Sequence, residues 1–106
     1  MSDPADRRVL ALVTVPPSLE EILIDVLLGH EATSAFTSVA AHGHGANHQL
    51  LNLAEQVSGR RKQIQFQIEL AETAVEGLLA ALIEAIPGGD FHCSFLPLHP
   101  LSSRQI

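Results

Sequence analysis

The chain lacks tryptophan and tyrosine and has only four phenylalanines, one cysteine and one methionine among its 106 residues. Because Cys93 is the only cysteine, no disulfide can form within the chain. So few aromatic side chains cannot supply the stacking platform with which many proteins hold single-stranded nucleic acid. Hydrophobic residues still make up 46% of the sequence, which predicts a globular protein with an aliphatic core.

Basic residues are also scarce, with six Lys and Arg against twelve Asp and Glu. This balance argues against a nucleic-acid partner, since phosphates are neutralised by a basic surface. No apolar run approaches the ~20 residues of a membrane-spanning helix, and the first residues, MSDPADRR, lack the apolar segment of a signal peptide. We therefore expect a cytoplasmic protein of one domain, residues 1–106, without direct membrane insertion.

Four segments have the pattern of β-strands. Residues 9–15 are a continuous β-prone run, which predicts a strand that is apolar on both faces. Residues 64–70 alternate apolar side chains with Gln, Gln and Glu, which predicts a strand with one polar face. Weaker patterns predict strands at 34–41 and 91–96, and Cys93 should face the core in the last of them.

Two segments have the apolar spacing of three and four residues that is typical of amphipathic helices, at 19–27 and 75–86. Each is preceded by the S/T-x-x-E pattern of a capping box, at 18–21 and 73–76. Strand, helix and strand thus occur twice in the same order. This order predicts an α+β, ferredoxin-like βαββαβ sandwich, an antiparallel four-stranded sheet with two helices on one face.

The opposite face of that sheet has no layer of its own, although the strand at 9–15 contributes apolar side chains to it. Such a face favours an oligomer. Residues 43–60 form a long connection between the second and third strands, and connections of this length are uncommon unless they have a function. We expect the polar residues 1–6 to be flexible, and residues 98–106 form a C-terminal tail with several apolar side chains.

Three histidines, His42, His44 and His48, lie within seven residues of one another. Imidazole is the commonest protein ligand of zinc, copper and nickel, and in an extended backbone the first two would point to the same side. His92 could add a ligand across a subunit boundary. The alternative is a set of solvated histidines beside glycines that the turn requires, because a tetrahedral site usually needs a fourth ligand.

The basic cluster of Arg60, Arg61 and Lys62 is the only one in this acidic chain. An arginine fork could receive a phosphate or carboxylate. Strand alternation would place Arg60 and Lys62 on one side and Arg61 on the other. The alternative is a solvated strand edge that discourages pairing with other strands.

The stretch LAEQVSGRRKQIQFQI, with HGHG before it, resembles a bacterial family of domains of unknown function in the PII-like superfamily. The resemblance spans residues 7–98. Genes of that family commonly lie beside heavy-metal efflux systems, and the superfamily includes nitrogen regulatory PII proteins and CutA-type cation-tolerance proteins. The resemblance implies a homotrimer with ligand clefts between subunits. Each cleft would be lined by the 43–60 connection and by the turn that contains Gly88 and Gly89.

The chain departs from PII proteins at the cleft. Residues 43–47 are Gly-His-Gly-Ala-Asn where PII proteins have Gly-Phe-Gly-Arg-Gln, and no lysine follows the glycines of the later turn. The resemblance therefore implies the architecture and the position of the cleft, and it leaves the ligand open. A divalent or copper-type metal ion and an adenine nucleotide are the two candidate cofactors.

No Ser/His/Asp or Cys/His arrangement has the spacing of a catalytic site, so we expect a non-enzyme. The resemblance implies a signal-transduction protein that senses a small ligand or a divalent metal, with a membrane metal-efflux transporter as a candidate partner. Three alternatives remain: a histidine-based metal-buffering protein, an adenine-nucleotide-binding regulator and a structural trimer.

Overall fold

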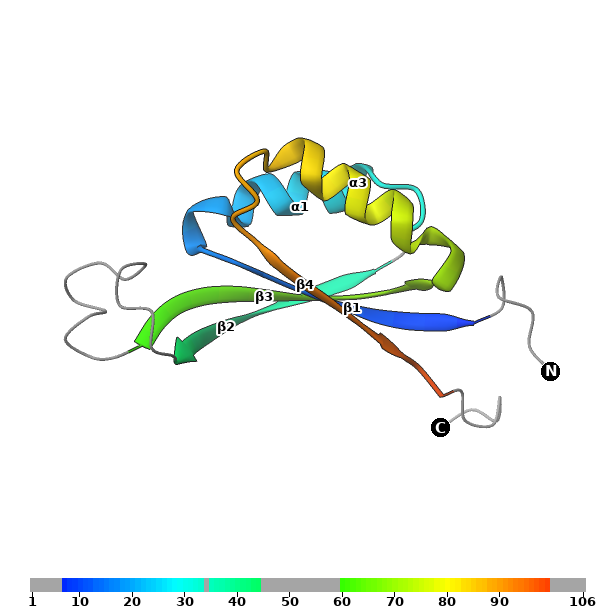
Figure 1. Cartoon of the computed structure of the whole chain (residues 1–106), viewed down its shortest axis with the longest axis horizontal. Helices are drawn as coiled ribbons and strands as arrows, with labels where there is room; N and C mark the ends of the chain where they lie inside the picture. The colour runs from blue at the N-terminus through cyan, green and yellow to red at the C-terminus, as the bar shows by residue number, and fades with distance from the viewer. Residues whose placement is uncertain (1–6, 34, 45–59, 100–106) are drawn as a thin grey trace.

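The computed structural model describes residues 7–33, 35–44 and 60–99. The strands within them are β1 (Arg8–Val15), β2 (Phe36–His44), β3 (Arg60–Ala71) and β4 (His92–Pro97). The α-helices are α1 (Glu20–Gly29) and α3 (Val75–Ala85), and each follows a short 3-10 turn, η2 (Pro17–Leu19) or η4 (Glu72–Ala74). The strand order is β2-β3-β1-β4, every neighbouring pair is antiparallel, and both helices lie on one face (Figure 1). The predicted ferredoxin-like fold is confirmed.

The hydrophobic core lies between the sheet and the helices. Alternate side chains of β1 point into it, and those of Ala11 and Val13 are fully buried. Phe66 in β3 is also fully buried, and its ring packs on Phe36 of β2 with ring centroids 6.1 Å apart. The helices contribute their apolar stripes to the same core, in which the buried helical residues are Leu23, Leu27, Leu78 and Leu82.

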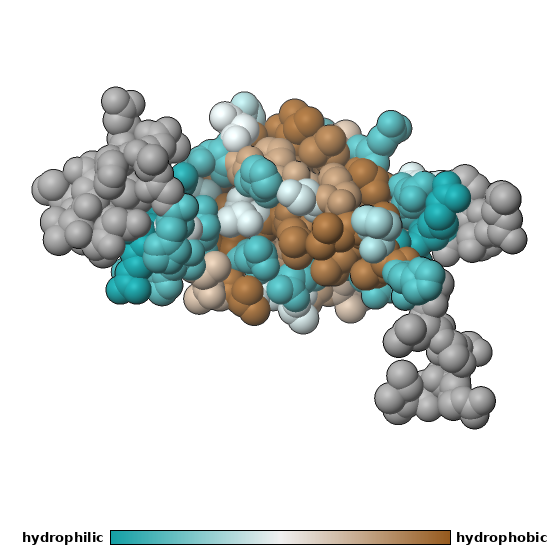
Figure 2. All heavy atoms as spheres, turned by 60° about the horizontal axis from the view of Figure 1, so that its bottom comes forward, coloured by the Kyte–Doolittle hydropathy of each residue, from teal (hydrophilic) through white to brown (hydrophobic). Residues whose placement is uncertain are grey.

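The other face of the sheet has no helices on it. Leu10 and Leu12 of β1 are half-buried there, whereas Leu96 of β4 is 47% exposed and Val39 of β2 is 43% exposed. Viewed from this side, apolar surface gathers at the centre of the molecule, with hydrophilic surface towards both ends (Figure 2). The apolar uncovered face that the pattern of β1 predicts is therefore present.

Both capping-box predictions are wrong. The N-cap residues of the two helices are Leu19 and Ala74, and neither makes a side-chain capping hydrogen bond. Ser18 and Thr73 instead lie inside the 3-10 turns that lead into the helices. At the first helix the cause is the preceding proline pair, because Leu19 N donates to Pro16 O at 3.0 Å and closes the tighter turn before the α-helix begins.

The second strand is longer than predicted. It continues through the first two histidines to His44, and β3 begins at Arg60. Both ends of the predicted 43–60 connection are therefore strand residues paired with each other, and residues 45–59 lie outside the described part of the chain. The predicted N-terminal segment 1–6 and most of the C-terminal tail, residues 100–106, also lie outside it. Neither of the described helices is long and apolar enough to span a membrane.

Replacing Phe66 with Ala should lower the free energy of unfolding by about 3–5 kcal/mol, because the change removes a large buried side chain and leaves a cavity. Leu28→Ala is the control, since Leu28 is 72% exposed and its truncation should change stability by less than about 0.5 kcal/mol. Urea denaturation of both variants measures the difference. Similar losses for the two would show that the core does not lie where the sheet and helices meet.

Candidate functional site

Two histidines and two basic residues share one face at the end of the β2–β3 pair. His42 is directly opposite Lys62, and His44 is directly opposite Arg60. They lie on the face that the helices cover, because each is an even number of residues along its strand from the core-facing pair of Phe36 and Ile68. All four side chains are exposed. Residues 42–44 have the extended backbone of β2, so the two imidazoles lie on the same side of the strand.

His92 lies far from this pair. It is opposite Thr14 on the uncovered face, at the edge of the sheet away from β2. Three strand spacings, about 14 Å, separate the two edges. Within residues 7–33, 35–44 and 60–99, no group of three His, Cys, Asp or Glu side chains could hold a metal ion. His48 lies outside the described residues, so the four-histidine metal site stays a prediction that needs more than one subunit.

Cys93 faces the helices, as predicted, opposite Val13 of β1. The Cys93 side chain is half-buried at the border of the core. Phe91 and Phe95, two positions before and after it in the sequence, are also half-buried and pack against the core. Burial raises the pKa of its thiol. Because the thiolate is the reactive and metal-binding form, this environment opposes both roles.

The third basic residue, Arg61, points to the uncovered face. Its Nη2 atom lies 3.5 Å from Oδ1 of Asp90, in the turn between α3 and β4. The Arg61 side chain is 26% exposed and that of Asp90 is 60% exposed. The predicted separation of Arg61 from Arg60 and Lys62 is therefore confirmed.

Arg61 and Asp90 lie beside a small cavity of about 150 Å³, which we call the Arg61 cavity. Other side chains that line it come from β1, β3 and β4, and the turn before β4 completes it; these residues include Thr14, Gln63, Gly89 and His92. Three of the predicted site residues, Arg61, Gly89 and His92, are thus brought together, whereas Gly88 is not among the lining residues. Thr14, Gln63 and Asp90 were not predicted as site residues.

The turn that places Asp90 depends on Gly89. Its φ is +67°, in the left-handed region that glycine adopts without steric cost, and its N–H donates to Ile86 O at 3.0 Å. This bond closes the turn that follows α3 and leads the chain to the start of β4. Position 89 therefore fixes where the Asp90 carboxylate stands relative to Arg61.

Gly43 leaves room for the side chain of Gln63. A Cβ atom at position 43 would come within 2.7 Å of Oε1 of Gln63, so the glutamine amide occupies the space above this glycine. Gln63 also lines the Arg61 cavity. Gly43 therefore leaves space for a side chain that forms part of the cavity wall.

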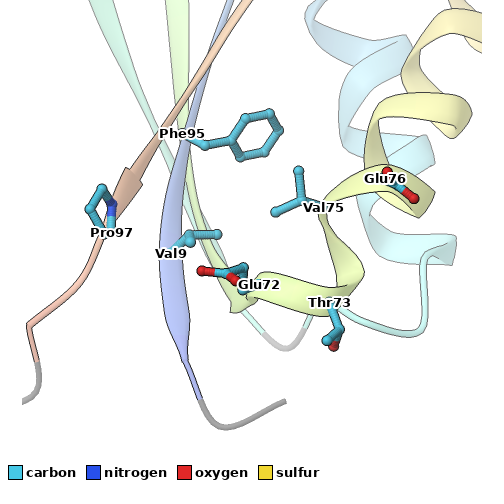
Figure 3. A pocket seen from close by; sticks show the side chains of 7 residues that line it. All are labelled: Val9, Glu72, Thr73, Val75, Glu76, Phe95 and Pro97. Carbon is cyan, nitrogen blue, oxygen red and sulfur yellow. The ribbon is translucent and has the colours of Figure 1, made fainter. Parts of the chain in front are cut away.

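A larger groove of about 580 Å³ lies at the other end of the molecule. Figure 3 shows Phe95 and Val75 facing each other across it, with Glu72, Thr73 and Glu76 on the helical side. Arg7 Nη2 donates to Oε1 of Glu72 at 3.1 Å, so one of the two carboxylates is already paired. None of the predicted site residues lines this groove.

The order of elements and the sheet topology define a ferredoxin-like fold. The chain belongs to the family described as "Protein of unknown function (DUF3240)", whose model matches residues 5–99. The resemblance stated from the sequence is thereby confirmed. A comparison with curated proteins finds no match.

Solved structures show the same fold. A DUF3240 family protein from Shewanella baltica OS155 has a TM-score of 0.74 at 16% identity, and the match covers 92% of this chain and 97% of that one. PII from Arabidopsis thaliana, bound to citrate, has a TM-score of 0.65 at 19% identity and coverages of 92% and 82%. CutA from Synechococcus elongatus PCC7942, complexed with Bis-Tris, has a TM-score of 0.66 at 13% identity and coverages of 87% and 80%. At these identities the likeness establishes the fold.

Replacing Gly89 with Ala should destabilise the protein by about 1–2 kcal/mol, because an L side chain is strained in the left-handed region. Gly88→Ala is the matched control, since Gly88 has no positive φ and its Cβ would meet nothing within 4 Å. Thermal and urea unfolding of both variants give the comparison. Equal stabilities would mean that the turn does not constrain Asp90.

Proposed function

We propose that this chain is a PII-like regulatory protein that senses a small anionic ligand in the Arg61 cavity. The observation that carries the proposal is that the guanidinium of Arg61 has few hydrogen-bond acceptors around it. The Arg61 side chain is about three-quarters buried and its guanidinium has five N–H donors, yet among the described residues its only side-chain interaction is the 3.5 Å ion pair with Asp90. That distance is longer than a good N–H···O bond. A phosphate or carboxylate would supply the acceptors that the fork lacks.

The size of the cavity supports a ligand that is held by its anionic group. At about 150 Å³ it is smaller than the ~300–1,000 Å³ of sites that enclose a whole small molecule. The rest of the ligand would extend towards a neighbouring subunit. The structural relative from Arabidopsis thaliana is bound to citrate, which carries carboxylates, and adenine nucleotides carry phosphates. Either kind of ligand has a group that suits Arg61.

A homotrimer is part of this proposal. Arg61, Gln63, Thr14 and His92 occupy positions on the uncovered face, and Thr14 of β1 is directly opposite His92 of β4. Assembly through the apolar centre of that face would bury side chains that are now partly exposed to water, such as that of Leu96. The Arg61 cavity would then lie beside a subunit boundary. Its side chains act in this proposal by binding, and we assign no catalytic step to them.

Signalling would pass through the connection between β2 and β3. Arg61 is the second residue of β3, so a ligand on its guanidinium lies next to the point where that connection enters the sheet. Reordering of a connection on a rigid scaffold is a common switch in regulatory proteins. A partner protein would read the change.

Arg61→Gln should weaken binding of inorganic phosphate and citrate by roughly tenfold or more, because a charge-assisted hydrogen bond contributes about 1.5–3 kcal/mol. Arg60→Gln is the matched control: it removes the same charge one residue away, on the opposite face of β3. Its affinity should stay within about twofold of the wild type. Isothermal titration calorimetry measures both. Equal losses would indicate unspecific attraction to the basic cluster, and no binding by the wild type would reject an anion sensor.

A second candidate function is metal handling, either as sensing linked to an efflux transporter or as buffering. It is favoured by the observed placement of His42 and His44 on one side of β2. Lys62 and Arg60, directly opposite, oppose it because like charges raise the cost of binding a cation. The candidate therefore requires further ligands, such as His48 or a second subunit's histidines.

Replacing His42 and His44 together with Ala should abolish any micromolar binding of zinc, copper(I) or nickel. Lys62→Gln should instead strengthen it severalfold, since the change removes a neighbouring positive charge. Equilibrium dialysis with each metal tests both variants, and thermal stabilisation by an adenine nucleotide is measured in parallel. Metal binding that survives the double change would move the site away from these histidines. If neither metals nor anions shift the melting curve, the structural-trimer alternative gains.

A further inference from the structure

Asp90 stands where a ligand anion would approach Arg61. Its Oδ1 atom is the partner of Arg61 Nη2, and both residues line the Arg61 cavity. An incoming phosphate or carboxylate would meet a carboxylate that already pairs with its own binding group. Both cannot remain close to one guanidinium without repelling each other, because like charges a few ångströms apart are destabilising in a partly buried site.

We propose that Asp90 is an internal competitor, a carboxylate that holds Arg61 in the empty state and is displaced by the ligand. This inference rests on the proposed function and adds its regulation. The competitor sets the concentration at which the site responds, because every binding event must first break the ion pair. Occupancy then changes the α3–β4 turn as well as Arg61.

The exposures identify which partner moves. Asp90 is 60% exposed and Arg61 is 26% exposed, so the carboxylate can turn into water while the guanidinium keeps its place in the cavity wall. The pairing is also loose, since 3.5 Å is an ion-pair distance without good hydrogen-bond geometry. A ligand that makes two short, parallel bonds to the fork replaces a weaker contact with a stronger one.

Displacement of the Asp90 carboxylate would affect the start of β4, because of where Asp90 lies in the chain. It follows Gly89, whose φ of +67° starts the last part of the turn, and it precedes Phe91, which packs against the core. His92, two residues further on, lines the same cavity. A change at Asp90 is therefore transmitted to the first residues of β4 over a short, constrained path.

The alternative is that Asp90 only fastens the turn to β3. A fastener and a competitor predict opposite effects of Asp90→Asn on ligand affinity. Loss of a fastener loosens the cavity wall and weakens anion binding. Loss of a competitor frees Arg61 and strengthens anion binding.

The test is calorimetric titration of inorganic phosphate and citrate into the full chain and its Asp90→Asn variant. We expect the variant to bind both anions roughly threefold to fivefold more tightly, the range expected when one partly exposed ion pair no longer has to be broken. Asp25→Asn is the control, because it removes the same charge from an exposed position on α1 and should leave the affinities unchanged. The double variant Arg61→Gln/Asp90→Asn should lose the gain, since Asp90 acts through Arg61.

A second readout uses the amide NMR signals of Gly89 and Asp90. In the competitor model, the Gly89 signal of the free Asp90→Asn variant shifts towards its position in the phosphate-bound wild type. Wild-type binding that is unchanged or weakened by Asp90→Asn would overturn the competitor and leave the anion sensor standing. Absence of phosphate and citrate binding in both wild type and variant would reject the sensor, and the competitor with it.

Discussion

The register of β3 between its two neighbours is the constraint on which the rest of the structure depends. Phe66, Ile68 and Leu70 are fully buried on one face of this strand, and glutamines occupy the other. Because side chains alternate strictly, a slip of one residue would expose the three apolar side chains and bury the glutamines. The free energy of burying the core therefore also fixes the orientation of every polar side chain along the strand.

This constraint divides the basic cluster. Arg60 and Lys62 fall on the side of the histidines, and Arg61 falls on the side of Gln63. One face thus gathers positive charge in an exposed position, whereas the other places a single, partly buried guanidinium against a cavity. The chemistry of the two faces differs for that reason alone, although the three residues are adjacent in the sequence.

The fold could be predicted from the sequence because its signals are local and periodic. The alternation at 64–70 and the apolar spacing at 19–27 and 75–86 each correspond to an observed element, and their order admits few topologies. The separation of Arg61 from its neighbours followed from the same alternation. The helix starts were predicted wrongly, because a capping-box pattern does not reveal that a 3-10 turn precedes each helix, set at the first helix by a proline pair.

The cavity was predicted only in part, since its lining comes from three strands and a turn that are distant in the sequence. Asp90 is an ordinary acidic residue after two glycines, and only the tertiary structure places it beside Arg61. Thr14 reaches the cavity because β1 and β4 are paired in register, which no local pattern states. Sequence spacing could suggest that His92 joins the other histidines, but the strand order separates them across the width of the sheet.

The contact between Gly43 and Gln63 links the composition of an edge strand to the width of the cavity. Any side chain larger than hydrogen at position 43 would require the Gln63 amide to shift, and Gln63 lines the Arg61 cavity. The size of the residue at position 43 therefore bears on the shape of the cavity wall. A substitution at position 43, which does not itself line the cavity, would therefore alter the cavity wall while leaving Arg61 unchanged.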